Sequence, residues 1–205
     1  MGNSHASKYP PLQTTSNCVT SRFMGTWFVV GVKPTFLETT ASNAVEIYTK
    51  TDGSKKHDID IDFQMNQDKP IESALKSYPQ KGWVVGNNKE DSPVWKVSPF
   101  WGVYMPFNII ELPDDRDSAT KNGKPYEYVV IGYPNRQYCW IMSRTPEMSE
   151  GTYTMLTERL KTKHQYTLDG LRRVPQKWTK DEREKRSLVK DIPDKYLVKD
   201  DEPLN

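Results

Sequence analysis

The feature that most constrains the fold is a series of short β-type segments between residues 24 and 144, separated by turn signals. In the clearest segment Ile59, Ile61 and Phe63 alternate with aspartates, so one face is apolar and the other faces water. Asp52-Gly53, just before it, is a strong signal for a tight turn. Eight antiparallel strands in an open sheet would leave exposed edges, and closure removes them. The sequence therefore predicts an all-β fold, an eight-stranded antiparallel up-and-down barrel.

The expected strands differ in clarity. The segment 66–80 is ambiguous, because 71–78 is compatible with a helical turn or with the start of a strand, and Pro79 is expected to end it. A short ninth strand is expected at 171–174. The eight barrel strands are expected at about 24–32, 44–50, 57–63, 82–85, 94–98, 107–112, 126–132 and 137–144.

Trp27 lies at the head of the first strand, in Gly25-Thr26-Trp27, and Arg144 ends the last one. A guanidinium stacked on an indole ring contributes about 0.5–2 kcal/mol and restrains both side chains. We therefore expect Trp27 to plug one end of the barrel and Arg144 to cover it. Gly25, Trp27 and Arg144 are predicted to be structural residues.

A helix is expected at about 149–163, with Ser149 as its N-cap and Tyr153, Leu156 and Leu160 along one face. That face should pack outside the barrel. Three parts of the chain are expected: a polar N-terminal arm at 1–20, the barrel domain with its helix at 21–175, and a charged C-terminal extension at 176–205. The extension contains a charged helical segment, Lys180 to Arg186, which we expect to be solvated.

Composition excludes some functions. The chain has 205 residues, with 29 basic and 27 acidic side chains and a net charge of +2. This balance does not indicate a nucleic-acid partner. No apolar run reaches the roughly 18 residues of a membrane span. The polar N-terminus has no apolar core of a secretory signal, so a cytoplasmic protein is expected, or else a processed, secreted or lumenal form.

Three stretches of the chain carry a recognisable pattern: Phe23 to Phe28 with Phe36-Leu37-Glu38, Val94 to Phe100 with Asn108-Ile109-Ile110, and Trp140 to Pro146. Together they resemble the lipocalin family, in particular its bacterial outer-membrane, plant temperature-induced and apolipoprotein D group. The resemblance covers roughly residues 20–175 and is most specific at Trp140-Ile141-Met142-Ser143-Arg144-Thr145-Pro146. The family's turn motif after the sixth strand is reduced here to Leu112-Pro113-Asp114, followed by a charged insertion at 113–125.

The resemblance implies binding, transport or storage of a small hydrophobic ligand such as a fatty acid, lysophospholipid, sterol, carotenoid or haem. Strand alternation from Arg144 turns Met142 and Trp140 into the barrel, and the resembled group has a pocket-lining Trp at the position of Trp140. Residue composition alone leaves open whether the barrel is hollow or filled. The expected pocket residues are Ile59, Ile61, Phe63, Trp140 and Met142, with Phe36, Leu37, Trp101 and Tyr104 at the mouth.

No catalytic site is predicted. The three histidines are scattered without metal-ligand spacing, and no cofactor is expected. Two alternatives stay open: a lipid-modifying enzyme of lipocalin type, and an interaction module without a ligand. Gly2 follows the initiator Met and is a candidate for N-myristoylation, which would give peripheral membrane association.

Overall fold

The barrel is closed by its first strand, which pairs with both the second and the eighth. The computed structural model describes residues 9–16, 18–100, 102–114 and 123–198. Neighbouring strands pair in the order β2-β3-β4-β5-β6-β7-β8-β1-β9, and a further β2–β1 pairing completes the ring. The strands are β1 Gly25–Lys33, β2 Ala41–Lys50, β3 Ile59–Gln67, β4 Lys76–Val84, β5 Val94–Phe100, β6 Val103–Glu111, β7 Tyr128–Gly132, β8 Cys139–Ser143 and β9 Arg172–Arg173.

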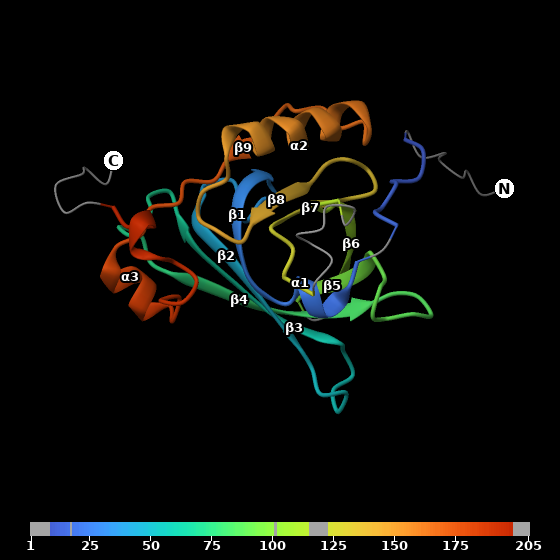
Figure 1. Ribbon diagram of the computed structural model, residues 1–205, viewed down its shortest axis with the longest axis horizontal. Coiled ribbons are helices and arrows are strands. Elements are labelled where there is room, and N and C mark those ends of the chain that lie inside the picture. The colour runs from blue at the N-terminus through green and yellow to red at the C-terminus, as the bar shows by residue number, and fades with distance from the viewer. Residues whose placement is uncertain (1–8, 17, 101, 115–122, 199–205) are drawn as a thin grey trace.

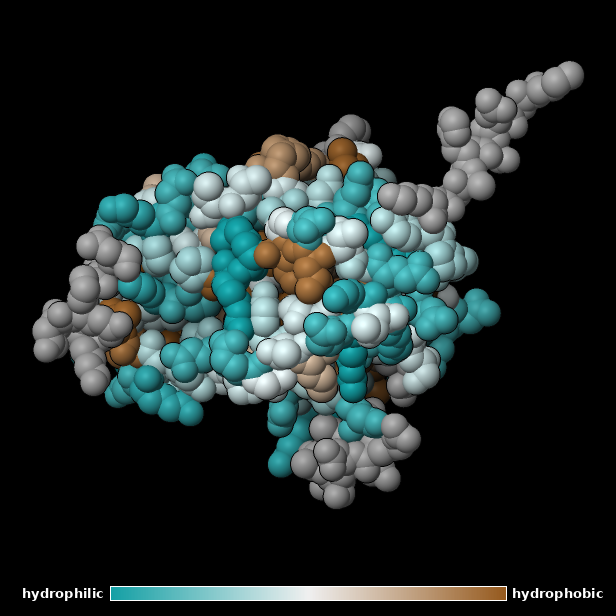
Figure 2. Space-filling view, turned by 90° about the horizontal axis from the view of Figure 1, so that it is seen from above, coloured by the Kyte–Doolittle hydropathy of each residue, from teal (hydrophilic) through white to brown (hydrophobic). Residues whose placement is uncertain are grey.

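The expected fold class is confirmed: eight antiparallel strands form a closed barrel, and one longer helix packs outside it. In the described parts of the chain, three α-helices and a 3₁₀ turn accompany the strands: α1 Thr20–Phe23, α2 Glu150–Thr162, α3 Lys180–Lys185 and η1 Asp194–Tyr196. Figure 1 shows α2 lying across the outside of the barrel at the top, with α3 beside the sheet at the left. From the side of α2 the surface is largely hydrophilic, with small separate hydrophobic patches (Figure 2).

Strand alternation divides the apolar side chains between two clusters. In β3, Ile59, Ile61 and Phe63 are buried in the barrel interior, while the aspartates between them are half-exposed on the outside. In β1, Trp27 points into the barrel, and Phe28 points out into a second cluster beneath α2 and the C-terminal segment. The wall of the barrel therefore buries apolar residues on both faces wherever later parts of the chain cover it.

Helix α2 begins as the sequence predicts. The Ser149 hydroxyl accepts a hydrogen bond from the backbone N–H of Thr152 at 3.1 Å, which satisfies a donor that the helix leaves free. Leu156 and Leu160 are fully buried against the barrel. Gly31 of β1 allows this packing, because a Cβ there would lie 2.8 Å from the ring of Tyr153.

Arg144 covers the closed end of the barrel, as expected. Its guanidinium lies 3.7 Å from the centre of the Trp27 ring. Its Nη2 donates to the carbonyl oxygens of Arg22, Phe23 and Met24 at 2.9–3.0 Å, where α1 ends. Its Nη1 donates to Thr26 O at 2.8 Å and its Nε to Tyr126 O at 3.0 Å. A single cation thus satisfies carbonyl groups of three chain segments.

Gly25 has a structural reason to be glycine. Its φ is +98°, a conformation that L side chains rarely adopt, and a Cβ there would lie 3.4 Å from Arg144 Nη1. Beneath this cover, α1 inserts Phe23 against Trp27, with ring centroids 5.3 Å apart. Trp95 and Phe107 stack deeper in the barrel at 5.6 Å. Aromatic packing therefore fills the closed end.

One expected segment end and one expected solvated surface are wrong. The ambiguous segment does not end at Pro79: this residue lies inside β4, opposite Asp62 of β3. The charged segment 180–186 is not simply solvated, because Glu182, Arg183 and Arg186 are buried. Arg186 Nε donates to Glu182 Oε1 at 2.7 Å, and its Nη1 donates to Asn43 O of β2 at 2.8 Å.

Trp178 explains why the C-terminal segment docks. It is fully buried, and its ring meets that of Phe28 edge-on, with centroids 6.0 Å apart. The guanidinium of Arg186 lies 4.8 Å from the centre of the Trp178 ring. The buried cations are thus held by an aromatic ring, carbonyl groups and a carboxylate, so their burial is compensated. Residues 176–198 form part of the packed structure.

Candidate functional site

A cavity of about 350 Å³ opens at the end of the barrel opposite Arg144. Its walls come from β2 to β6, the β1–β2 loop, the β5–β6 hairpin and the β7–β8 hairpin. Stacked Trp95 and Phe107 lie toward the closed end, and Tyr48 packs with them, 6.1 Å from Phe107. The aromatic side chains that line the cavity are Phe36, Tyr48, Phe63, Tyr78, Phe100, Tyr104, Phe107, Tyr133, Tyr138 and Trp140.

The structure brings together six of the nine residues that the sequence predicted for the pocket. Ile61, Phe63 and Trp140 line its wall, and Phe36, Leu37 and Tyr104 lie at the mouth. That they bind a ligand stays a prediction.

Ile59 and Met142 do point into the barrel, but they lie in its packed core and do not line the cavity. That these two residues contact a ligand stays a prediction, since the cavity wall does not include them. Trp101 lies outside the described residues.

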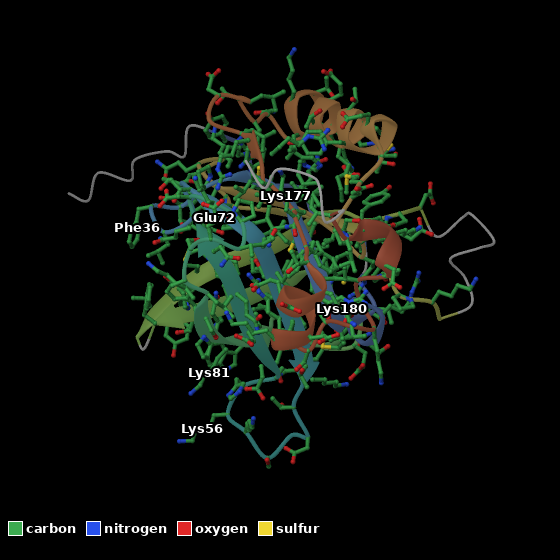
Figure 3. The ribbon with its side chains drawn as sticks, turned by 90° about the vertical axis from the view of Figure 1, so that its left-hand side faces the viewer. Phe36, Lys56, Glu72, Lys81, Lys177 and Lys180 are labelled. Atoms are coloured by element: carbon green, nitrogen blue, oxygen red, sulfur yellow. The ribbon has the colours of Figure 1, made fainter. Side chains whose placement is uncertain are left out.

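The mouth is apolar and exposed. Phe36, in the β1–β2 loop, is 80% exposed, and Tyr104 is 58% exposed. Phe100 and Val103 of the β5–β6 hairpin also have exposed side chains. Figure 3 shows Phe36 projecting from the surface, far from Lys56 at the tip of the β2–β3 hairpin. Exposed apolar residues rimming a cavity are typical of a surface that admits a ligand.

Two glutamates at the cavity were missed by the sequence analysis. Glu38 is only 5% exposed, in the β1–β2 loop. Its Oε1 accepts a hydrogen bond from Trp140 Nε1 at 2.7 Å, and its Oε2 accepts one from Thr35 Oγ1 at 2.7 Å. Arg172 ties the same loop to β9 by donating to Glu38 O and Ala41 O. These bonds fix the loop and orient the Trp140 ring.

Glu46 lies in β2 with its side chain in the barrel and is 8% exposed. The Tyr48 hydroxyl donates a hydrogen bond to its Oε2. Burial, opposed by this bond and reinforced by the charge of Glu38, raises the pKa of Glu46 to about 7. Among the described residues, no other hydrogen bond reaches this carboxyl group.

The inward direction of Glu46 was hard to read because both faces of β2 carry apolar residues. Val45 and Ile47 turn outward into the cluster beneath the C-terminal segment, whereas Tyr48 turns inward. A register based on alternation alone would place Val45 and Ile47 inside. The pairing of Glu46 with Trp27 across β1 and β2 is the signal that identifies the inner face.

A second ionic cluster lies outside the barrel, between β6 and α2. Glu111 is buried and accepts hydrogen bonds from Arg159 Nη1 at 2.9 Å and Lys163 Nζ at 2.7 Å. Its Oε1 also lies 2.8 Å from His164 Nε2. Although burial alone would raise the pKa of Glu111, these partners lower it to about 2. This cluster joins the helix to the barrel.

Both described cysteines are buried free thiols. In the described parts of the chain, no three His, Cys, Asp or Glu residues lie close enough to hold a metal ion. Cys139 lies in the outer cluster, and burial raises the pKa of its thiol to about 12, so it is not a thiolate nucleophile. No helix among the described residues is both long and apolar enough to cross a membrane.

Comparisons with known proteins agree with this architecture. Residues 19–176 match the family profile described as a lipocalin-like domain. Temperature-induced lipocalin-1 of Arabidopsis thaliana is 29% identical over 160 residues, covering 76% of this chain and 77% of the relative.

Solved structures with the same fold are more distant in sequence. Insecticyanin from the tobacco hornworm Manduca sexta superposes with a TM-score of 0.58 at 13% identity, covering 87% of this chain and 90% of that one. The cockroach allergen Per a 4 gives a TM-score of 0.53 at 14% identity, covering 83% and 95%. At such identities these two structures speak to the fold alone.

Proposed function

Because the chain belongs to the lipocalin family, we propose that it binds a small, predominantly apolar ligand in the cavity at the open end of the barrel. The observation that carries this proposal is the cavity itself, about 350 Å³ and lined mainly by aromatic and aliphatic side chains. Ligand pockets of proteins have volumes of roughly 300–1,000 Å³ and such linings. A transport or storage role follows if the ligand is released intact.

The depth of the cavity limits the ligand. Trp95 and Phe107 occupy the closed half, so a ligand occupies the half that lies between Tyr48 and the mouth. Each buried methylene contributes about 0.8 kcal/mol, against the cost of ordering the chain and of association. A medium-length acyl chain or a compact ring system fits this space, and we expect a micromolar dissociation constant.

A lipid-modifying enzyme is the second candidate function. The observation in its favour is Glu46, a carboxyl group in the cavity whose raised pKa of about 7 suits general acid–base catalysis. Under this alternative a bound lipid is converted to a product, and Glu46→Gln abolishes the conversion. Under the carrier proposal the lipid is recovered unchanged.

An interaction module with a filled barrel is the third alternative, and the cavity argues against it. Membrane association through an acylated Gly2, with a cytoplasmic location, is also proposed, on the sequence motif alone. Gly2 lies outside the described residues. An N-terminal peptide of the native protein that carries no acyl group would remove this part of the proposal.

The test of the proposed function is native mass spectrometry of protein purified from its own cells, followed by extraction and identification of the bound compound. Recombinant protein and the Ile61→Asp variant are then titrated with that compound. A charge at Ile61, in the cavity wall, should abolish binding, whereas Asp60→Asn on the outer face of β3 should leave it within about twofold. Equal binding by all three proteins would place the ligand elsewhere.

A further inference from the structure

Every charged side chain among the described residues that line the cavity is acidic. These are Glu38 and Glu46, and the described lining contains no Lys, Arg or His. Its other titratable groups are the phenols of Tyr48, Tyr78, Tyr104, Tyr133 and Tyr138. The cavity therefore offers a carboxylate ligand no cation for an ion pair, and it repels such a ligand whenever either glutamate is ionised.

The two glutamates differ in how well the protein already satisfies them. Glu38 accepts hydrogen bonds from Trp140 and Thr35, and the positive charge of Arg172 acts on it. Glu46 receives only the Tyr48 hydroxyl among the described residues, and its Oε1 accepts no hydrogen bond from them. Burying an ionised carboxylate with so little compensation is unfavourable. A ligand with a positively charged N–H donor would compensate the charge of Glu46 and supply the missing hydrogen bond.

The rings around Glu46 add a second attraction for a cation. Phe63 of β3, which lines the cavity, is directly opposite Glu46 in the β2–β3 register. Phe63 and Tyr78 lie with ring centroids 6.0 Å apart in the cavity wall. Aromatic faces next to a carboxylate are the usual surroundings of a bound organic ammonium.

We propose that the ligand of this cavity is an apolar compound with a protonated amine, and that Glu46 is its counter-ion. The proposal rests on the proposed function and names the substrate class of the same site. Glu46 lies in the middle of β2, below the mouth formed by the β1–β2 loop. The ammonium group therefore enters first, and the apolar part fills the space between Glu46 and the exposed rim.

The experiment compares three compounds of equal chain length: dodecylamine, dodecanol and dodecanoate. Each is titrated below its aggregation limit at pH 8 against the neutral probe N-phenyl-1-naphthylamine bound to the full chain. At this pH the amine is protonated and dodecanoate is ionised. We expect the ammonium to bind at least about tenfold more tightly than dodecanoate, with dodecanol between them.

Two variants locate the effect. Glu46→Gln keeps the shape and the bond from Tyr48, and it should weaken ammonium binding about tenfold while dodecanol binding stays within about twofold. Asp62→Asn removes the same charge from the outer face of β3 and should change none of the three affinities. Circular dichroism and the melting temperature show whether each variant is folded. The comparison of the three compounds on the wild-type protein tests the proposal even if a variant does not fold.

The outcomes separate the two proposals. If dodecanol and the probe bind but dodecanoate binds as tightly as the ammonium, the cation proposal is overturned and the apolar-ligand proposal stands. If Glu46→Gln weakens all three compounds equally, Glu46 is not the counter-ion and the proposal is also overturned. If none of the compounds and no neutral probe binds, both proposals fail together.

Discussion

The two ends of the barrel are built on opposite principles. At the closed end, Phe23, Trp27 and Trp95 pack ring against ring, and Arg144 satisfies the carbonyl groups that α1 leaves free. At the open end, aromatic residues face a cavity, and buried Glu46 has only one hydrogen-bond partner among the described residues. Stability is concentrated where polar groups are satisfied, and the capacity to bind is concentrated where they are not.

The largest effect is expected from Trp27→Ala at the closed end. Removing this fully buried indole should lower the free energy of unfolding by about 3–5 kcal/mol, because it leaves a cavity and Arg144 loses its stacking partner. Urea unfolding measures the change. Phe36→Ala at the mouth is the control and should cost less than about 0.5 kcal/mol, since Phe36 is 80% exposed. Equal costs would contradict the contrast between the ends.

Arg144→Ala should lower the free energy of unfolding by about 3 kcal/mol. The cost is large because the carbonyl groups of Met24, Thr26 and Tyr126 lose the guanidinium as donor. Phe23 O keeps the hydrogen bond from Trp27 Nε1. Arg144→Lys restores one charge but not the fork of donors, so it should recover only part of the loss. If binding of the neutral probe is lost while unfolding is unchanged, Arg144 acts at the ligand and not in the scaffold.

Two buried glutamates are expected to change the stability of the fold with pH in opposite directions. Glu111 lies in a satisfied cluster, and its partners depress its pKa from 4.5 to about 2. A depressed carboxyl pKa stabilises the fold above the unfolded-state value, so about 2–3 kcal/mol should be lost as pH falls from about 4.5 toward 2. Unfolding measured at pH 6 and pH 3 should show this loss in the wild type and a smaller one in Glu111→Gln. Identical pH dependence in both proteins would contradict it.

Glu46 should act in the opposite direction. Burial raises its pKa from 4.5 to about 7, so the stability present below about 4.5 is lost as pH rises through 7. Glu46→Gln should therefore resemble the wild type at pH 5 and be more stable by about 2 kcal/mol at pH 8. Thermal unfolding at the two pH values measures the difference. A variant less stable at pH 8 would mean that Glu46 is satisfied when ionised.

The sequence predicted those parts of the molecule in which one face meets water. Alternation at Ile59, Ile61 and Phe63 identified the inner face of β3, and Ser149 marked the start of α2. The sequence did not reveal the inner face of a strand that is covered on both sides. In β2, for example, the C-terminal segment buries Val45 outside the barrel. Glu46 was missed for that reason.

The prediction that the C-terminal segment is solvated was wrong for a related reason. A run of charges such as Lys180 to Arg186 is solvated by default, but Trp178 provides a buried ring on which Arg186 packs. Pro79 was expected to end the ambiguous segment 66–80, since proline removes a backbone donor. It lies inside β4 opposite Asp62, and the pairing continues on both sides of it. Such tertiary contacts are not encoded in local periodicity.

Intrinsic fluorescence during a ligand titration tests most directly that the open end is the binding site. Trp140 lies in the cavity wall, while Trp83 lies outside it and donates to Lys56 O at 2.7 Å. Titration with dodecanol should shift the emission of the wild type and of Trp83→Phe, and Trp140→Phe should lose most of that shift. A shift retained in Trp140→Phe and lost in Trp83→Phe would contradict the assignment of the cavity as the site.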